Sequence, residues 1–168
     1  QNLGDEYWNH LPQFLKTGVP IARMDAVQES EAQYQKQVTA LAWMMKPAAE
    51  AMALILGFGK ARKAVSILDV GAGSAVWSLT LASKDAATTV TALDWPGVLK
   101  IASAAAQQAG LQDRFTVLPG NYHDVPLRGA AYDLAIVANV AHIETREGNQ
   151  KLFQRLYRAL KLGGEIAV

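Results

Sequence analysis

The chain has 168 residues, of which 51% are apolar and 18% charged, with 16 Lys and Arg against 15 Asp and Glu. This composition suits a globular domain and excludes an intrinsically disordered chain. Because no dense basic run is present, a nucleic-acid partner is not expected. The absence of cysteine excludes disulfides and thiolate chemistry, and it favours a reducing compartment such as the cytoplasm.

Membrane insertion and export are not expected from the sequence. Glu50 and Gly57 interrupt the longest apolar candidate before it reaches the roughly 18 residues of a membrane span. Residues 1–11 lack the basic start and apolar stretch of a secretory signal. The chain begins without Met and stops in what reads as a buried strand, so we expect it to be a piece of a longer protein.

The first sixty residues have a helical pattern. Tyr34, Val38, Leu41 and Met45 are spaced by four, three and four residues, which places them on one face of a helix. Proline is well tolerated at a first helical position, so Pro47 is expected to start a separate helix that ends near Gly57. Residues 1–60 are therefore predicted to form a helical cap.

From residue 61 to residue 168, short apolar runs alternate with segments of helical period. Strands are predicted at 65–70, 88–93, 115–118, 132–138 and 165–168, and helices at 75–83, 97–109 and 148–160. Alternating strands and helices form right-handed βαβ units. The sequence thus predicts a doubly wound, Rossmann-like α/β domain whose ligand crevice lies at the carboxyl ends of the strands.

The first predicted strand leads into a glycine loop. Asp69 is followed by Gly71 and Gly73, which permit a sharp turn and close approach of the backbone to a ligand, although a plain tight turn has the same pattern. A second acid, Asp94, ends the next strand, where a carboxylate typically accepts from the hydroxyls of a ribose. The pair indicates a nucleoside ligand. Val76 stands where a dinucleotide fingerprint has glycine or alanine, which disfavours a pyrophosphate.

Several motifs together give a family resemblance. The chain resembles the class I S-adenosylmethionine-dependent methyltransferases in the segments 69–73, 94–96, 120–122, 132–134 and 162–164. Residues 94–99 are similar to those of the small-molecule O-methyltransferases of the caffeate and bacterial tailoring type. The resemblance implies strand order 3-2-1-4-5. It also implies two further strands and a helical dimerisation domain that this chain lacks, and therefore a possible homo-oligomer formed through such sequence or through the uncovered fifth strand.

The resemblance also assigns roles to single residues. Asp69 would lie near the cationic methionine end of the cofactor and Asp94 at the ribose, while Trp95 would lie on adenine or simply belong to the core. Asn121 replaces an acid that accepts from the adenine amino group. The full set expected to bind S-adenosylmethionine is Asp69, Gly71, Ala72, Gly73, Asp94, Trp95, Gly120, Asn121, Tyr122 and Asn139.

The segment after the fourth strand carries the candidate base. In the plant-type O-methyltransferases that the chain resembles, a histidine at the place of His142 takes the proton from the acceptor hydroxyl, and imidazole titrates in the range that this role needs. A histidine that only packs or caps the following helix is the alternative. Glu144 or Glu147 is a candidate to orient it. His123 and Asp124 are interpreted as a polar turn, with a place at the same mouth of the crevice as the alternative.

The predicted function is methylation of a hydroxyl on a small, aromatic molecule. Trp43 is expected to line the acceptor pocket, whereas Met45 is expected in the helix core. No metal site is predicted, because the three histidines are widely spaced and no carboxylate cluster accompanies them. Two alternatives remain open at this point: a non-catalytic domain that binds the cofactor or acts as a scaffold, and a nicotinamide-dependent oxidoreductase.

Overall fold

The computed structural model describes residues 5–19 and 27–168. Its elements follow the predicted alternation of strands and helices. In chain order they are α1 (Asp5–Thr17), α2 (Val27–Ile55), β1 (Ser66–Val70), α3 (Val76–Ala82), β2 (Thr89–Asp94), α4 (Pro96–Gln108), the 3-10 turn η1 (Gln112–Arg114), β3 (Phe115–Pro119), β4 (Tyr132–Ile136), α5 (Arg146–Ala159) and β5 (Leu160–Ala167).

The five strands form one parallel sheet of order β3-β2-β1-β4-β5, which confirms the prediction. The central strands β1 and β4 are buried along almost their whole length. Parallel strands that are covered on both faces must be apolar throughout, and this is why their sequences are continuous hydrophobic runs. The carboxyl ends of β1, β2 and β4 consequently meet at one edge of the sheet.

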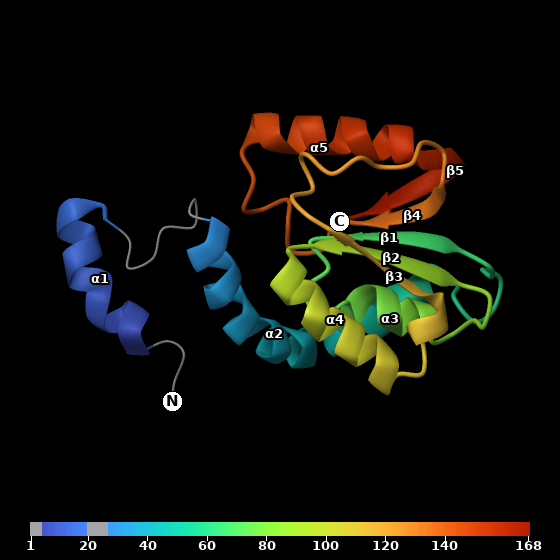
Figure 1. Ribbon diagram of the computed structural model, residues 1–168, viewed down its shortest axis with the longest axis horizontal. Helices are drawn as coiled ribbons and strands as arrows, with labels where there is room; N and C mark the ends of the chain where they lie inside the picture. The colour runs from blue at the N-terminus through green and yellow to red at the C-terminus, as the bar shows by residue number, and fades with distance from the viewer. Residues whose placement is uncertain (1–4, 20–26) are drawn as a thin grey trace.

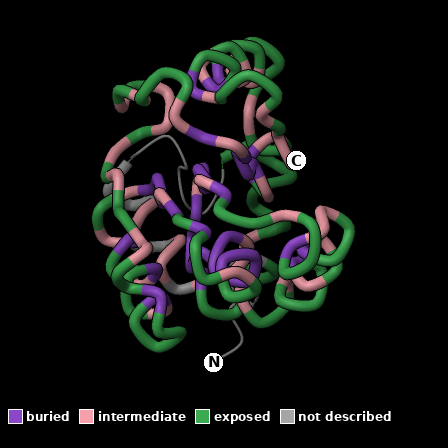
Figure 2. Tube along the Cα trace, turned by 90° about the vertical axis from the view of Figure 1, so that its right-hand side faces the viewer, coloured by how far each residue is buried: buried purple, intermediate pink, exposed green. Residues whose placement is uncertain are grey.

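Helices cover both faces of the sheet (Figure 1). Helix α5 packs on one face through Leu152, Leu156 and Ala159, while α3 and α4 pack on the other. Figure 2 shows the buried stretches in the interior and the exposed ones on the outer turns. Helix α1 lies apart from the sheet, and its Trp8 and Leu15 are exposed.

Helix α2 corrects one prediction, because it runs through Pro47 without a break. A proline inside a helix removes one backbone hydrogen bond and disfavours the preceding turn. Here packing compensates for that cost: Ala49 and Ala53 are buried, Lys46 Nζ donates to Thr80 Oγ1 at 3.0 Å, and Glu50 pairs with Lys84 at 2.7 Å. These contacts fasten the C-terminal half of α2 to α3.

Within α2, the segment Gln37–Ile55 has a mean hydropathy of 1.2 and is 17% buried. It is therefore long and apolar enough to cross a membrane, judged by length and composition alone, contrary to the expectation from the sequence. One such helix is weak evidence for a membrane location, since a helix that packs on a soluble core has the same properties.

Strand β5 starts five residues earlier than predicted. Its pairing with β4 shifts register between Tyr132 and Leu134, and Gly163 adopts a positive φ of 78°. The start of β5 could not be predicted from the sequence, because Lys161, Leu162 and the two glycines do not form an apolar run. Leu162 is fully exposed on this edge strand.

Apolar side chains at the centre of the sheet are expected to contribute strongly to the stability of the fold, and substitution of Leu134 in β4 tests this. Leu134 is fully buried against Ile67 and Ile136. We expect Leu134→Ala to lower the free energy of unfolding by about 3 kcal/mol, because it removes buried methyl groups and leaves a cavity. Urea denaturation measures this loss. The matched control Leu162→Ala is expected to change stability by no more than about 0.5 kcal/mol, and equal losses in the two variants would contradict the assignment.

Candidate active site

The glycine loop between β1 and α3 begins the site. Gly71 and Gly73 adopt positive φ values of 62° and 58°, and Ala72 N donates to Leu93 O of β2 at 3.1 Å. A Cβ on Gly71 would come within 2.6 Å of Val140 Cγ2, so both the backbone and the space require glycine there. Ala75 also has a left-handed backbone, with φ 58°.

Asp69 lies at the end of β1, beneath this loop, and is buried. Ser78 Oγ of α3 donates to its carboxylate at 2.5 Å. Burial raises the pKa of Asp69 to about 7, while the hydrogen bonds from Ser78 oppose the rise and nearby Asp94 adds to it. A cationic ligand at this point would reverse the shift. Sequence reasoning identified Asp69 but missed Ser78. The only feature that could have indicated Ser78 is that it is a small polar residue on the inner face of α3.

Asp94 ties two turns together at the end of β2. Its Oδ2 accepts from Gly73 N at 2.8 Å and its Oδ1 accepts from Trp95 N at 2.7 Å. Burial raises the pKa of Asp94. Each carboxylate oxygen keeps a second lone pair, so the pair of oxygens remains able to accept from two ribose hydroxyls. Trp95 is half-buried and precedes α4 directly.

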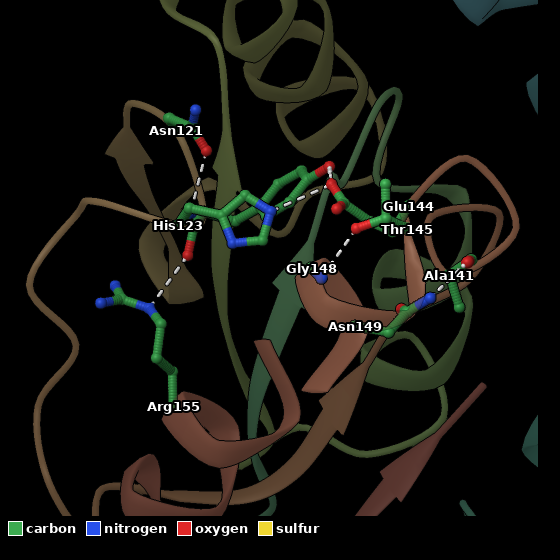
Figure 3. A network of polar contacts seen from close by, with 9 residues as sticks. Asn121, His123, Ala141, Glu144, Thr145, Gly148, Asn149 and Arg155 are labelled. Carbon is green, nitrogen blue, oxygen red and sulfur yellow. Dashed lines mark hydrogen bonds and ion pairs between the residues drawn. The ribbon is translucent and has the colours of Figure 1, made fainter. Parts of the chain in front are cut away.

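The turn after β3 contains the segment expected to meet adenine. Gly120 N donates to Asp94 O at 2.9 Å, which places this turn beside the end of β2. The amide oxygen of Asn121, which was expected to accept from adenine, accepts from His123 N at 2.9 Å within the turn itself (Figure 3). Its remaining lone pair is what it can offer to a ligand.

Helix α2 covers the glycine loop. The space between them is a cavity of about 40 Å³ lined by Tyr34, Val38, Leu41, Ala42, Met45, Gly71, Ala72, Gly73, Ser74, Val76, Trp77, Ala138 and Asn139. Small-molecule sites usually measure about 300 Å³ or more. The cavity is therefore too small by itself for a nucleoside-sized ligand, and Asp94, which is expected to meet the ribose, is not part of its lining.

The structure places Trp43 and Met45 differently from what the sequence suggested. Trp43 is 82% exposed and does not line the cavity, whereas Met45 does. The helical spacing of Tyr34, Val38, Leu41 and Met45 marked the face that closes over the glycine loop, and Trp43 lies on another face. Tyr34 was missed as a site residue. Burial, together with Asp94 and Asp69, raises the pKa of its hydroxyl to about 12, so it stays protonated.

The N-terminal half of α2 is held at the start of α4. Glu31 Oε1 accepts a hydrogen bond from Gly97 N. A Cβ at Gly97 would collide with Glu31 and Gln35, so a glycine is needed for this close approach. No local sequence pattern signals this contact, because Glu31 and Gly97 are 66 residues apart.

The loop after β4 carries His142 and Asn139. Asn139 has a positive φ of 60° and lines the cavity, while His142 is exposed. Glu144, one of the two acids expected to orient His142, instead accepts from Tyr122 Oη at 2.5 Å and contacts His123 Nε2 at 3.0 Å. His123 and Asp124 line a separate hollow against α5, so His123 belongs to a network and not only to a polar turn.

The comparisons with known proteins agree with this geometry. Residues 67–164 match the family model described as a methyltransferase domain, which covers more than half of the chain. The chain belongs to the methyltransferase-domain family. The oxidoreductase alternative is not supported, and the resemblance to the class I S-adenosylmethionine-dependent methyltransferases is confirmed.

Individual relatives match different shares of this chain. The L-tyrosine C(3)-methyltransferase of Streptomyces lavendulae is 33% identical over 102 residues, which are 61% of this chain and 28% of the relative. A protein of Nostoc punctiforme assigned as an O-methyltransferase has a TM-score of 0.81 at 19% identity, over 99% of this chain and 48% of its own. The structure of mitomycin 7-O-methyltransferase has a TM-score of 0.79 at 19% identity. The match covers 99% of this chain and 50% of that enzyme. This chain thus spans between about a quarter and a half of the length of these relatives.

The residues present fit S-adenosylmethionine, the cofactor of this methyltransferase class. The buried carboxylates of Asp69 and Asp94 suit a cationic ligand with ribose hydroxyls, and the glycine loop provides close backbone approach. When bound, the cofactor supplies an electrophilic methyl group on a sulfonium. Among residues 5–19 and 27–168, no group of three or more acidic or histidine side chains is placed to hold a metal ion.

Proposed function

We propose that this chain transfers the methyl group of S-adenosylmethionine to a small molecule that carries a phenol. The observation that carries the proposal is Asp94, a buried carboxylate held against Gly73 of the glycine loop. Two similarities support a small-molecule acceptor. One is the sequence similarity to an enzyme named for L-tyrosine, and the other is the structural similarity to a mitomycin O-methyltransferase.

The acceptor atom is proposed to be the phenolic oxygen, with His142 as the base. In the transfer, the acceptor oxygen bonds to the methyl carbon, the carbon–sulfur bond breaks with its electron pair going to sulfur, and the phenolic proton passes to the base. Holding nucleophile and methyl carbon in line supplies much of the acceleration. A base adds about 10²- to 10⁴-fold.

Methylation of the phenol ring is a second candidate, favoured by the 33% identity with an enzyme named as a C(3)-methyltransferase of tyrosine. Removing the phenolic proton makes the carbon beside the oxygen nucleophilic too. That carbon bonds to the methyl carbon, the electron pair of the carbon–sulfur bond goes to sulfur, and the ring carbon then loses its own proton while the oxygen regains one. One proton is released in either outcome. The position of the acceptor relative to the methyl carbon then decides between them.

The experiment incubates the full-length protein with S-adenosylmethionine that carries a labelled methyl group and with L-tyrosine or simple phenols. O-methylation abolishes the ultraviolet change that accompanies phenol ionisation at high pH, whereas C-methylation keeps it. Donor binding is measured separately by a thermal shift with S-adenosylmethionine, its demethylated product and NAD. Binding of the first two without transfer to any phenol would favour a non-catalytic domain, and a shift with NAD alone would overturn the proposal.

His142→Ala tests the base. Because His142 is exposed, we expect a change in stability of no more than about 0.5 kcal/mol. The transfer rate is expected to fall at least about 100-fold with an unchanged dissociation constant for the donor. Steady-state kinetics and calorimetry measure the two quantities, and His10→Ala on α1 is the histidine control. A rate within twofold of wild type would remove His142 from the mechanism.

A further inference from the structure

Glu144 joins the two loops that the proposed reaction uses. One loop, residues 120–125, follows β3 and contains the turn expected to meet adenine. The other, residues 139–145, follows β4 and carries His142. Glu144 Oε1 accepts from Tyr122 Oη at 2.5 Å and lies 3.0 Å from His123 Nε2 (Figure 3). We call Tyr122, His123 and Glu144 the loop bridge.

The loop bridge is a charged and mostly enclosed contact. The side chains of Glu144 and His123 are 16% and 27% exposed. Burial alone would raise the pKa of Glu144, but the hydrogen bonds from Tyr122 and His123 bring it below its usual value, so the carboxylate stays ionised. Burial and the same carboxylate raise the pKa of Tyr122, which keeps its hydroxyl a donor. Hydrogen bonds to a charged acceptor are stronger than neutral ones.

The start of α5 accommodates the carboxylate. A Cβ on Gly148 would collide with Glu144 Oε2, so glycine is required in this first turn. Thr145 caps the helix by accepting from Gly148 N at 3.0 Å. A negative charge beside a helix N-terminus is stabilised by the partial positive charge of the unpaired N–H groups there. Glu144 is thus held on the α5 side as well as on the side of Tyr122.

Helix α5 also anchors both loops directly. Arg155 Nε donates to Tyr122 O at 3.2 Å, and its guanidinium bonds Val125 O. Asn149 Nδ2 donates to Ala141 O at 2.8 Å. Asn149 therefore fixes Ala141, the residue before His142. The loop bridge fixes Glu144, two residues after His142. Only His142 and Ile143, which are exposed, lie between these two anchors.

We propose that the loop bridge positions His142 relative to the nucleoside-binding turn. Glu144 is a positioning residue, since it contacts Tyr122 and His123 and acts on the reaction through His142. Because the same carboxylate holds the turn beside Asp94, cofactor binding at that turn and the placement of the base are coupled. This inference rests on the proposed function for its kinetic consequence but not for its geometry.

The kinetic test uses Glu144→Gln and Tyr122→Phe in the full-length protein with labelled donor and a phenol that the wild type methylates. Glutamine has one acceptor oxygen and no charge, and phenylalanine keeps the ring of Tyr122 but loses the donor. We expect kcat to fall about 10- to 100-fold, because displacing a catalytic group by about 1 Å costs up to about 100-fold. For Glu144→Gln, whose residue is not among those expected to contact the cofactor, the dissociation constant of the demethylated product is expected to change less than about threefold. Asp124→Asn, an exposed acid in the same loop, is the control and should keep the wild-type kcat.

The double variant with His142→Ala separates positioning from general destabilisation. If the loop bridge acts through His142, Glu144→Gln adds no further loss in the His142→Ala background. Losses that multiply, or a Glu144→Gln kcat within twofold of wild type, would overturn the inference.

A second measurement does not depend on turnover. Hydrogen exchange at residues 139–145 is expected to slow when the demethylated product binds to wild type but not when it binds to Glu144→Gln. Equal slowing in both proteins would overturn the coupling even if no acceptor is found. Absence of methyl transfer in the wild type, with this exchange difference present, would instead count against the proposed function alone.

Discussion

Asp94→Asn is expected to weaken the binding of S-adenosylmethionine by at least about 100-fold. Both oxygens of Asp94 accept backbone N–H groups, from Gly73 and from Trp95. An asparagine of the same shape has to turn its NH₂ group toward one of these donors. The substitution thus loosens the glycine loop and removes a charged acceptor for the ribose, and each hydrogen bond to a charged group contributes about 1.5–3 kcal/mol.

Isothermal titration calorimetry with S-adenosylmethionine and with its demethylated product measures this effect. Asp113→Asn is the matched control, since Asp113 is an exposed acid in η1 before β3. It is expected to leave both affinities unchanged. An affinity of Asp94→Asn within threefold of wild type would show that Asp94 does not hold the nucleoside.

Cofactor affinity is expected to fall as the pH falls below 7. The pKa of Asp69 in the free protein is about 7, raised first by burial. A cationic donor favours the ionised carboxylate, so below pH 7 binding must expel a proton. The dissociation constant then increases up to tenfold for each pH unit. The α-amino group of the donor, with an ordinary pKa of about 7.7–8.0, stays charged in this range and adds no slope of its own.

The measurement is the dissociation constant of S-adenosylmethionine between pH 5.5 and 7.5. Asp69→Asn should bind more weakly at pH 7.5 and show little dependence on pH. The stability of the free protein depends on pH in the opposite direction to cofactor affinity. Because folding raises the pKa of Asp69, the folded state binds the proton more tightly than the unfolded state does. This group therefore adds stability as the pH falls from about 7 toward 4. A flat wild-type affinity would refute a titrating Asp69 at the cofactor.

The sheet could be predicted from the sequence because its central strands, such as Ser66–Val70, are buried on both faces and leave continuous apolar runs. The acids Asp69 and Asp94 followed from their places at strand ends. Long-range contacts leave no such local signal. The bond between Glu31 and Gly97 and the loop bridge at Glu144 join segments 66 and 22 residues apart, and only the folded chain brings them together.

Pro47 misled the sequence analysis for a related reason. Local propensity favours a helix start at proline, but α2 gains more from packing Ala49 and Ala53 on its neighbours than it loses at one backbone hydrogen bond. Trp43 and Met45 differ by two positions and so lie on different faces of this continuous helix. Whether Trp43 or Met45 is exposed depends on which face of α2 is covered by α3, and the sequence did not show this.

The proline in α2 divides that helix into two mechanically different halves. The carbonyl of Trp43 has no N–H partner at position 47, so the helix bends most easily between the half fastened to α3 and the half that covers the glycine loop. The bond between Glu31 and Gly97 holds the half over the glycine loop in place. A bend near Pro47 would therefore move one wall of the cavity away from the loop while the contacts of the other half with α3 stay intact.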